Sequence, residues 1–277
     1  MGITASQVNE LRKATGAGMM DCKKALTETN GDMQAAIDYL RKKGQKISDK
    51  RADRESNEGV VVAKTSGDGK RGIVVELNCE TDFVAKNADF VAFAEKIAEV
   101  AMSEYPASTD ELLAANLDGA SVKDSILDQM AKIGEKLEVS HYERLEADNV
   151  VSYIHAGNKI GVLVGLTQPG DAASTAGRDA AMQIAAMRPL ALNKDGIAQE
   201  VIDKELAIAK EQIQAEGKPA ELAEKIANGK LNKFFKENTL LGQSFVKDPS
   251  QTVEGMLKAV DSNLTVTDYK RLEVGNN

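Results

Sequence analysis

One order of elements occurs twice in this chain, and it constrains the fold more than any other feature. Each copy consists of two β-branched runs joined by a turn. In the first copy the runs lie at residues 60–64 and 72–77 with the turn at 66–71, and in the second they lie at 150–154 and 161–166 with the turn at 156–159. An apolar helical pattern follows each copy, over residues 89–97 and 178–187. Such a duplication predicts an α+β core of two similar halves, each an antiparallel hairpin followed by a helix.

A small helical domain precedes this core. Residues 3–43 contain three short helical patterns separated by glycine-containing turns. Three helices in so short a segment make a minimal bundle, which we assign to residues 1–45. A domain this small hides its apolar residues poorly, so we expect one of Met19 and Met20 to enter the core and the other to stay at the surface.

The polar stretch over residues 46–57 connects the bundle to the core. It has no apolar periodicity, so we expect it to act as a flexible tether. The first half of the core then covers residues 58–145 and the second covers 146–277. Further elements are expected in both halves: helices near 109–117 and 121–133 with a strand at 136–145, and later a helix near 253–260 with a strand at 265–274.

A heptad spacing marks an insertion in the second half, at about residues 196–236. Apolar residues follow this spacing on one helix and can be faced by others from a returning helix: Ile202, Leu206, Ala209 and Ile213 on the first, and Leu222, Ile226 and Phe234 on the second. The turn between them falls at residues 217–219. The pattern predicts an antiparallel helical hairpin that projects from the core and offers a surface for self-association.

Charge and composition exclude several classes of protein. The net charge of -8 and a pI near 5.1 argue against a general nucleic-acid binder, because such proteins neutralise phosphates with Lys and Arg. Cys22 and Cys79 lie far apart without a Cys-x-x-Cys spacing, which fits a reducing compartment. No apolar run approaches the ~18 residues that a membrane helix needs, so we expect a soluble cytoplasmic protein with no membrane contact.

No arrangement of residues indicates an active site. The glycine pattern at residues 67–72 leads into a second strand rather than a helix, so it is a hairpin turn and not a nucleotide-binding loop. His141 and His155 are not spaced as a metal-binding pair, and His141 is most simply a surface residue of a strand. We therefore expect no enzymatic bond chemistry, no cofactor and no metal ion.

The most specific functional signal lies between the strand at 73–77 and the helix that Asn87 or Asp89 is placed to cap. Phe83 falls in this connection, between Asp82 and Lys86. An aromatic side chain in such a place either packs under its own helix or projects as a binding anchor. The local pattern by itself leaves both alternatives open.

The segment over residues 78–87, Asn-Cys-Glu-Thr-Asp-Phe-Val-Ala-Lys-Asn, resembles the signature of the bacterial elongation factor Ts family. A second segment, residues 11–26, resembles the amino-terminal motif of the same family, and weaker likeness extends over nearly the whole chain. The resemblance implies an amino-terminal domain of the ubiquitin-associated type. It also implies a guanine nucleotide exchange factor, not an enzyme, that forms a complex with elongation factor Tu and promotes the release of GDP.

The resemblance also assigns roles to individual residues. It implies that residues 81–84, Thr81, Asp82, Phe83 and Val84, bind the partner and dislocate its magnesium ion. Within this set, Asp82 and Phe83 are implied to enter the GTPase domain and disturb its magnesium and phosphate sites. From the bundle, the residues implied to hold the same domain are Arg12, Met19 and Met20. His155 matches a partner-contacting histidine of the family.

Two points qualify this assignment. Longer members of the family continue into a carboxy-terminal helix that adds partner contacts, whereas this sequence stops at residue 277. Without the two signatures, the composition would equally fit an interaction scaffold whose small bundle binds peptides.

Overall fold

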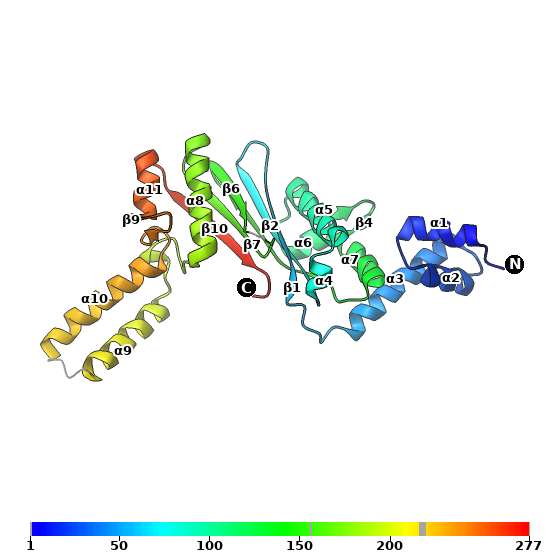
Figure 1. The fold of residues 1–277 in the computed structure, drawn as a ribbon, viewed down its shortest axis with the longest axis horizontal. Coiled ribbons are helices and arrows are strands. Elements are labelled where there is room, and N and C mark those ends of the chain that lie inside the picture. The colour runs from blue at the N-terminus through cyan, green and yellow to red at the C-terminus, as the bar shows by residue number, and fades with distance from the viewer. Residues whose placement is uncertain (1, 156, 216–219, 277) are drawn as a thin grey trace.

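The computed structural model describes residues 2–155, 157–215 and 220–276. A helical bundle, an α+β core and a helical hairpin follow one another along the longest axis of the molecule, with the bundle and the hairpin at opposite ends (Figure 1). In the part of the chain described, no helix is both long and apolar enough to cross a membrane.

The core contains two three-stranded antiparallel sheets that repeat one arrangement. The first sheet has the order β1-β2-β5 and the second the order β10-β7-β6. Their strands are β1 (Glu58–Thr65), β2 (Arg71–Cys79) and β5 (Glu138–Glu146), then β6 (Asn149–Ile154), β7 (Ile160–Leu166) and β10 (Val266–Glu273). The predicted duplication is confirmed, and it extends beyond the hairpins, because in each half a distant third strand pairs with the second strand of the hairpin.

The helices of the two halves also correspond. Helix α5 (Ala88–Glu104) packs on the first sheet and α8 (Asp171–Met187) on the second. Each half then forms a very short strand pair directly before another helix: β3 (Asn116–Leu117), β4 (Ala120–Ser121) and α7 (Val122–Ile133), and later β8 (Ser244–Phe245), β9 (Asp248–Thr252) and α11 (Val253–Val260). The first half also contains α6 (Thr109–Ala114), where a longer helix was expected, and the second contains the short turn η1 (Lys194–Gly196).

The two sheets pack face to face, and equivalent glycines allow their close approach. Gly72 lies near the start of β2 and Gly161 near the start of β7. A Cβ atom on Gly161 would lie 2.4 Å from Val61, and one on Gly72 would lie 2.7 Å from Val150. Val61 and Val150 belong to a cluster of buried side chains from both sheets. Each half therefore buries one sheet face under its helices and the other against its duplicate.

The bundle is fixed to the core rather than tethered to it. It consists of α1 (Ala5–Thr15), α2 (Met19–Glu28) and α3 (Met33–Lys50), so residues 46–50 of the expected linker are helical. Helix α3 packs against α7 of the core. The two backbones come close at Gly44, where a Cβ atom would lie 2.2 Å from the carbonyl oxygen of Leu127. The segment after α3 is also held, because Arg51 and Arg54 bind the carboxylate of Glu80 and Lys136 donates to the carbonyl oxygens of residues 52 and 54. The expectation of a flexible tether is therefore wrong.

Met19 and Met20 both lie at the surface, with 55% and 74% of their area exposed. The core of the bundle is formed instead by residues such as Leu11, Cys22 and Leu26, which are fully buried. The expectation that one methionine enters the core is therefore wrong. The two methionines form the first turn of α2, before the first residue of that helix that faces the core.

The predicted helical hairpin is present as α9 (Gln199–Ala215) and α10 (Ala220–Asn238). Its seam buries Ala209, Ile213 and Ala227, and Leu206 and Ile226 pack against them. Phe234 is half-buried beside Phe235. The predicted turn at 217–219 and the side chain of Leu222 lie outside the described residues.

Candidate protein-interaction site

Two helix caps shape the connection between β2 and α5. Thr81 caps α4 (Asp82–Ala85), a single helical turn, by accepting a hydrogen bond from the backbone N–H of Val84 at 3.4 Å. Asn87 then caps α5 by accepting from the backbone N–H of Asp89 at 2.8 Å. The chain therefore forms one short helix, stops and begins a second, as these caps require. We call residues 81–86 the Phe83 turn.

Phe83 projects from this turn into solvent. Its side chain is 84% exposed, the highest value among the exposed large apolar residues of the described chain. Ala85 is buried and Val84 packs against the core of the first half. Residues two apart in a helix point about 200° apart, so burying Ala85 directs Phe83 outward. Of the two alternatives that the sequence left open, the structure shows the projecting side chain.

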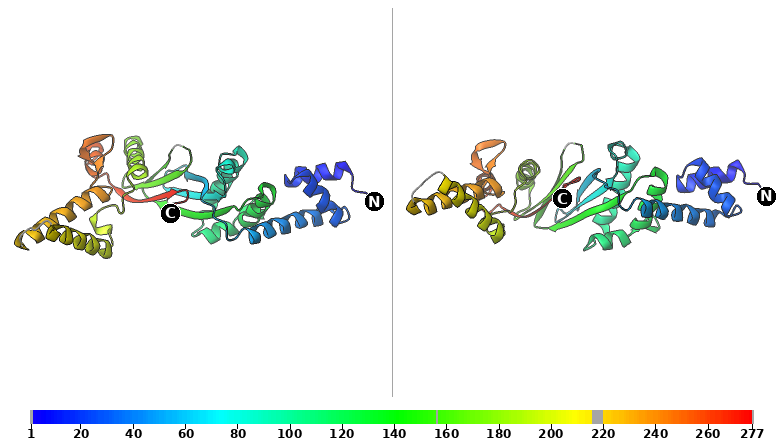
Figure 2. Two further views of the ribbon diagram at one scale, coloured as in Figure 1. Left: turned by 60° about the horizontal axis from the view of Figure 1, so that its bottom comes forward. Right: turned by 90° about the horizontal axis from the view of Figure 1, so that it is seen from below.

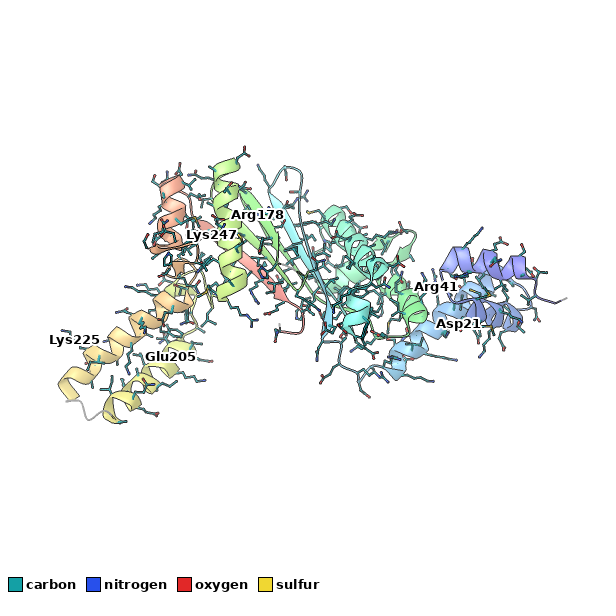
Figure 3. All side chains as sticks on the ribbon, viewed as in Figure 1. Asp21, Arg41, Arg178, Glu205, Lys225 and Lys247 are labelled. Carbon is teal, nitrogen blue, oxygen red and sulfur yellow. The ribbon has the colours of Figure 1, made fainter. Side chains whose placement is uncertain are left out.

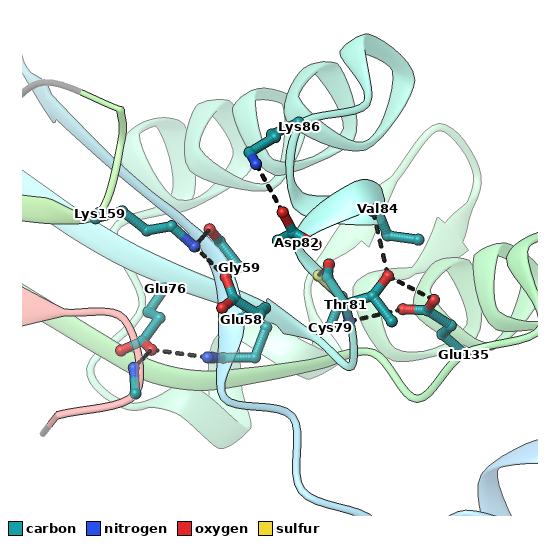
Figure 4. Close-up of polar contacts among 12 residues, drawn as sticks. Glu58, Gly59, Glu76, Cys79, Thr81, Asp82, Val84, Lys86, Glu135 and Lys159 are labelled. Atoms are coloured by element: carbon teal, nitrogen blue, oxygen red, sulfur yellow. Dashed lines mark hydrogen bonds and ion pairs between the residues drawn. The ribbon is translucent and has the colours of Figure 1, made fainter.

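Charged residues surround the base of the turn. The Nζ atom of Lys86 donates to Oδ2 of Asp82 at 2.6 Å, and this bond lowers the pKa of Asp82. Lys159, from the hairpin turn of the second half, lowers the pKa of Asp82 further and itself binds the carboxylate of Glu58 and the carbonyl oxygen of Gly59 (Figure 4). Asp82 is therefore ionised and lies close to the turn between β6 and β7.

His155 lies on that same β6–β7 turn. It is exposed, and its Nδ1 atom is 3.0 Å from the hydroxyl oxygen of Tyr153. The turn is attached to the first half, because the backbone N–H of Val61 donates to the carbonyl oxygen of Asn158 at 2.7 Å. Ala156, the next residue, lies outside the described chain. The duplication thus brings His155 to the side of the core that carries the Phe83 turn.

Arg12, Met19 and Met20 form a second exposed surface, on the bundle. Figures 1 and 2 show α1 and α2 at one end of the molecule, separated from α4 by α3 and α7. One ion pair joins the bundle to the core, where Arg41 on α3 lies 3.7 Å from Asp128 on α7. A second joins α3 to α2 within the bundle, where Lys43 lies 2.7 Å from Asp21. Asp21 and Arg41 are labelled in Figure 3. The structure therefore places the predicted site residues on two separate surfaces held in a fixed relation.

Glu80 connects the Phe83 turn to the segment that follows α3. Its carboxylate accepts from Arg51 at 2.5 Å, from Arg54 at 2.9 Å and from the backbone N–H of Lys136 at 2.7 Å. Burial by itself would raise the pKa of Glu80, but these three donors outweigh it and lower the pKa to about 2. The carboxylate therefore stays charged and bound at neutral pH.

The geometry offers contact surfaces rather than reactive groups. Burial raises the pKa of the Cys79 thiol to about 12, and the thiol donates to the carbonyl oxygen of Thr81 at 3.2 Å. Such a thiol is protonated at neutral pH and is a poor nucleophile. Among the described residues, no three or more His, Cys, Asp or Glu side chains are grouped so as to hold a metal ion. His141 belongs to β5, where its Nδ1 atom lies 3.2 Å from the buried Glu76.

Sequence reasoning did not single out three residues that shape this surface, namely Glu80, Glu135 and Lys159. Glu80 lies inside the signature segment, but its partners come from residues 51, 54 and 136. Glu135 contacts the turn from the end of α7. Lys159, from the second half, binds Gly59 on β1 and acts on Asp82 only through its charge. The sequence held a signal for Glu80 alone, because the basic stretch at residues 41–54 contains its partners Arg51 and Arg54.

Comparison with known proteins places the whole chain in one group. The family model described as Elongation factor TS matches residues 80–276. A protein named Elongation factor Ts from Christiangramia forsetii is 52% identical over 273 residues, which cover 99% of each chain. Proteins of the same name from Cytophaga hutchinsonii and Flavobacterium psychrophilum are 51% and 48% identical, and these matches cover at least 98% of this chain and 99% of each relative.

Proposed function

This chain belongs to the elongation factor Ts family, and we propose that it is the guanine nucleotide exchange factor of elongation factor Tu in translation elongation. An exchange factor speeds the release of a bound nucleotide and makes or breaks no covalent bond. The role therefore calls for contact surfaces, which the described chain provides, and for no catalytic nucleophile. It also places the protein in the cytoplasm, without direct contact to nucleic acid or membrane.

The exposed Phe83 carries the proposal. An aromatic side chain that is 84% exposed on a firmly held turn is typical of a binding anchor. Asp82, ionised beside it, adds a negative charge. We propose that Phe83 enters an apolar pocket of the GTPase domain and that Asp82 repels the phosphates and competes for the magnesium ion of the bound nucleotide.

Thr81 and Val84 have a different part in this proposal. Both are half-buried, Thr81 as the cap of α4 and Val84 against the core of the first half. We propose that Thr81 and Val84 hold the Phe83 turn in place and contact the partner only at the edge of the interface. His155, exposed on the β6–β7 turn, would add a contact from the second half of the core.

The energy required explains the need for a second surface. A nucleotide bound with nanomolar affinity is held by ~12 kcal/mol, and weakening it a thousandfold needs ~4 kcal/mol of coupling. Burying one Phe side chain supplies about 2 to 3 kcal/mol. Burial of Phe83 by itself therefore supplies less free energy than the coupling requires. We propose that Arg12, Met19 and Met20 bind the same GTPase domain from the bundle and supply the remainder.

Release of labelled GDP from purified elongation factor Tu tests the proposal directly. We expect catalytic amounts of this protein to accelerate release strongly. The other function that composition allows is a scaffold that binds peptides through the bundle. Such a scaffold would leave the GDP release rate unchanged and would retain a heterogeneous set of clients from cell extract rather than one GTPase.

A further inference from the structure

Two segments distant in sequence bind each other reciprocally beneath the Phe83 turn. The carboxylate of Glu80 accepts from the backbone N–H of Lys136 at 2.7 Å. The carboxylate of Glu135 accepts from the backbone N–H of Thr81 at 3.1 Å. In each case the acidic side chain of one segment binds the amide that directly follows the acidic residue of the other. We call these four residues the carboxylate clamp.

Glu135 holds the residue from which α4 starts. Besides the amide, its second oxygen accepts from the hydroxyl of Thr81 at 2.8 Å (Figure 4). Because the hydroxyl hydrogen points to Glu135, a lone pair of the same oxygen is free to accept from the N–H of Val84. The carbonyl oxygen of Thr81 accepts from the Cys79 thiol. All the polar groups of Thr81 are thus in use, and Glu135 sets the direction of the helix cap.

Phe83 makes too few contacts to fix its own direction, so its direction depends on the carboxylate clamp. Its side chain has little packing of its own, since only 16% of its area is covered when 84% is exposed. The neighbouring Asp82–Lys86 ion pair has side chains 46% and 74% exposed, and pairs of this kind hold geometry weakly. The direction in which Phe83 projects therefore depends on α4, and α4 depends on Thr81.

The other side of the clamp belongs to the elements that carry the bundle. Glu135 directly follows Gly134, the residue that ends α7 in a left-handed conformation with φ of 80°. Helix α7 packs against α3, and Arg51 at the end of α3 binds Glu80. The position of the Phe83 turn is thereby linked to the position of the bundle.

We propose that Glu135 is a positioning residue for nucleotide exchange, acting through Thr81 to aim Phe83 while the bundle holds the partner. This inference rests on the proposed exchange function. Removing Glu135 leaves two donors of Thr81 without their acceptor, so α4 samples other directions and Phe83 finds its pocket less often. The contact made by the bundle stays intact. The maximal rate of release should therefore fall much more than the affinity.

The test compares Glu135→Ala with Glu104→Ala, which removes an exposed carboxylate from α5. We expect Glu135→Ala to lower the maximal GDP release rate about tenfold or more, and to raise the half-saturating concentration by less than about threefold. Glu104→Ala should match the unaltered protein. In a Phe83→Ala background, Glu135→Ala should cost little more, because the side chain that it aims is gone. Glu135→Gln keeps one acceptor oxygen, so its maximal GDP release rate should lie between those of the unaltered protein and Glu135→Ala.

Hydrogen exchange at the amides of Thr81 and Val84, measured without partner, separates this inference from the proposed function. Both amides should lose protection in Glu135→Ala and keep it in Glu104→Ala. If the unaltered protein releases no GDP but these amides respond as expected, the exchange function fails while the clamp stands. Unchanged protection, or equal and additive effects of Glu135→Ala with and without Phe83, would overturn the positioning role. If Glu135→Ala fails to fold, Glu135→Gln is judged by the same two criteria.

Discussion

Replacing Phe83 by Ala separates binding from folding more sharply than any other single change. Because the side chain is 84% exposed, truncation removes little surface that folding buries, and the melting temperature should change by no more than a few degrees. In the complex the same side chain would be buried. Full burial of a Phe is worth about 2 to 3 kcal/mol, so the loss corresponds to roughly 30-fold to 140-fold in release rate, and at least about tenfold if burial is partial.

The assay is release of labelled GDP from elongation factor Tu, titrated with the unaltered protein, Phe83→Ala and two companion variants. Phe83→Leu keeps most of the apolar volume and should lose less activity than Phe83→Ala. Val260→Ala removes an apolar side chain that is 44% exposed at the end of α11 and should behave as the unaltered protein. Thermal unfolding of all four proteins, followed by circular dichroism, shows whether the fold is preserved.

One result would refute this reasoning. If Phe83→Ala melts at a much lower temperature while its folded fraction releases GDP at the normal rate, the side chain is a packing residue. The exchange mechanism proposed from the turn would then be wrong. A loss of activity equal in Val260→Ala and Phe83→Ala would also argue against a specific anchor.

Three further predictions concern other parts of the chain. Replacing residues 198–234 by a short Gly/Ser linker should leave a folded core with most of its GDP release activity, because the apolar residues of the hairpin pack against each other, and should abolish any self-association seen by sedimentation. A variant that folds but releases no GDP would show that the hairpin belongs to the exchange surface. Gly44→Ala should push α3 away from the carbonyl oxygen of Leu127, destabilise the protein by about 1 to 3 kcal/mol and raise the protein concentration that gives half-maximal GDP release. The control Gly119→Ala, at a site with open space but positive φ, should affect stability without changing that concentration. The pKa of Glu80 is lowered to about 2 from its usual 4.5, so its charged contacts stabilise the fold fully above about pH 4.5 and are lost as the pH falls toward 2. Urea unfolding should show that the unaltered protein loses stability more steeply over this pH interval than Glu80→Gln does, and equal slopes would contradict the role assigned to these contacts.

The duplicated core could be predicted from sequence because its signals are local. Runs of β-branched residues flank glycine turns in both halves, and each is followed by an apolar helical pattern. The hairpin α9–α10 was predictable for the same reason, since its heptad spacing specifies which face is buried. The third strand of each sheet was expected as an element, but its pairing was not, because that contact joins residues far apart along the chain.

The candidate site divides in a similar way. The signature at residues 78–87 identified the segment, yet whether Phe83 packs or projects depended on Ala85 being buried and on Glu135 binding Thr81 from a distant helix. No local pattern contains that information. The methionines of α2 show the same limit, because the bundle fills its core with other apolar residues and leaves both of them outside.

The segment after residue 45 shows most clearly what only tertiary structure decided. Its polar composition by itself predicted a tether, because no apolar face was present to bury. The structure instead continues α3 to Lys50, packs this helix on α7 at Gly44, and holds Arg51 and Arg54 on the partly buried carboxylate of Glu80. A glycine that permits close backbone approach and a carboxylate that needs charged partners act over long sequence distances. Periodicity therefore determined which elements form, and these long-range contacts determined how the two proposed binding surfaces are held together.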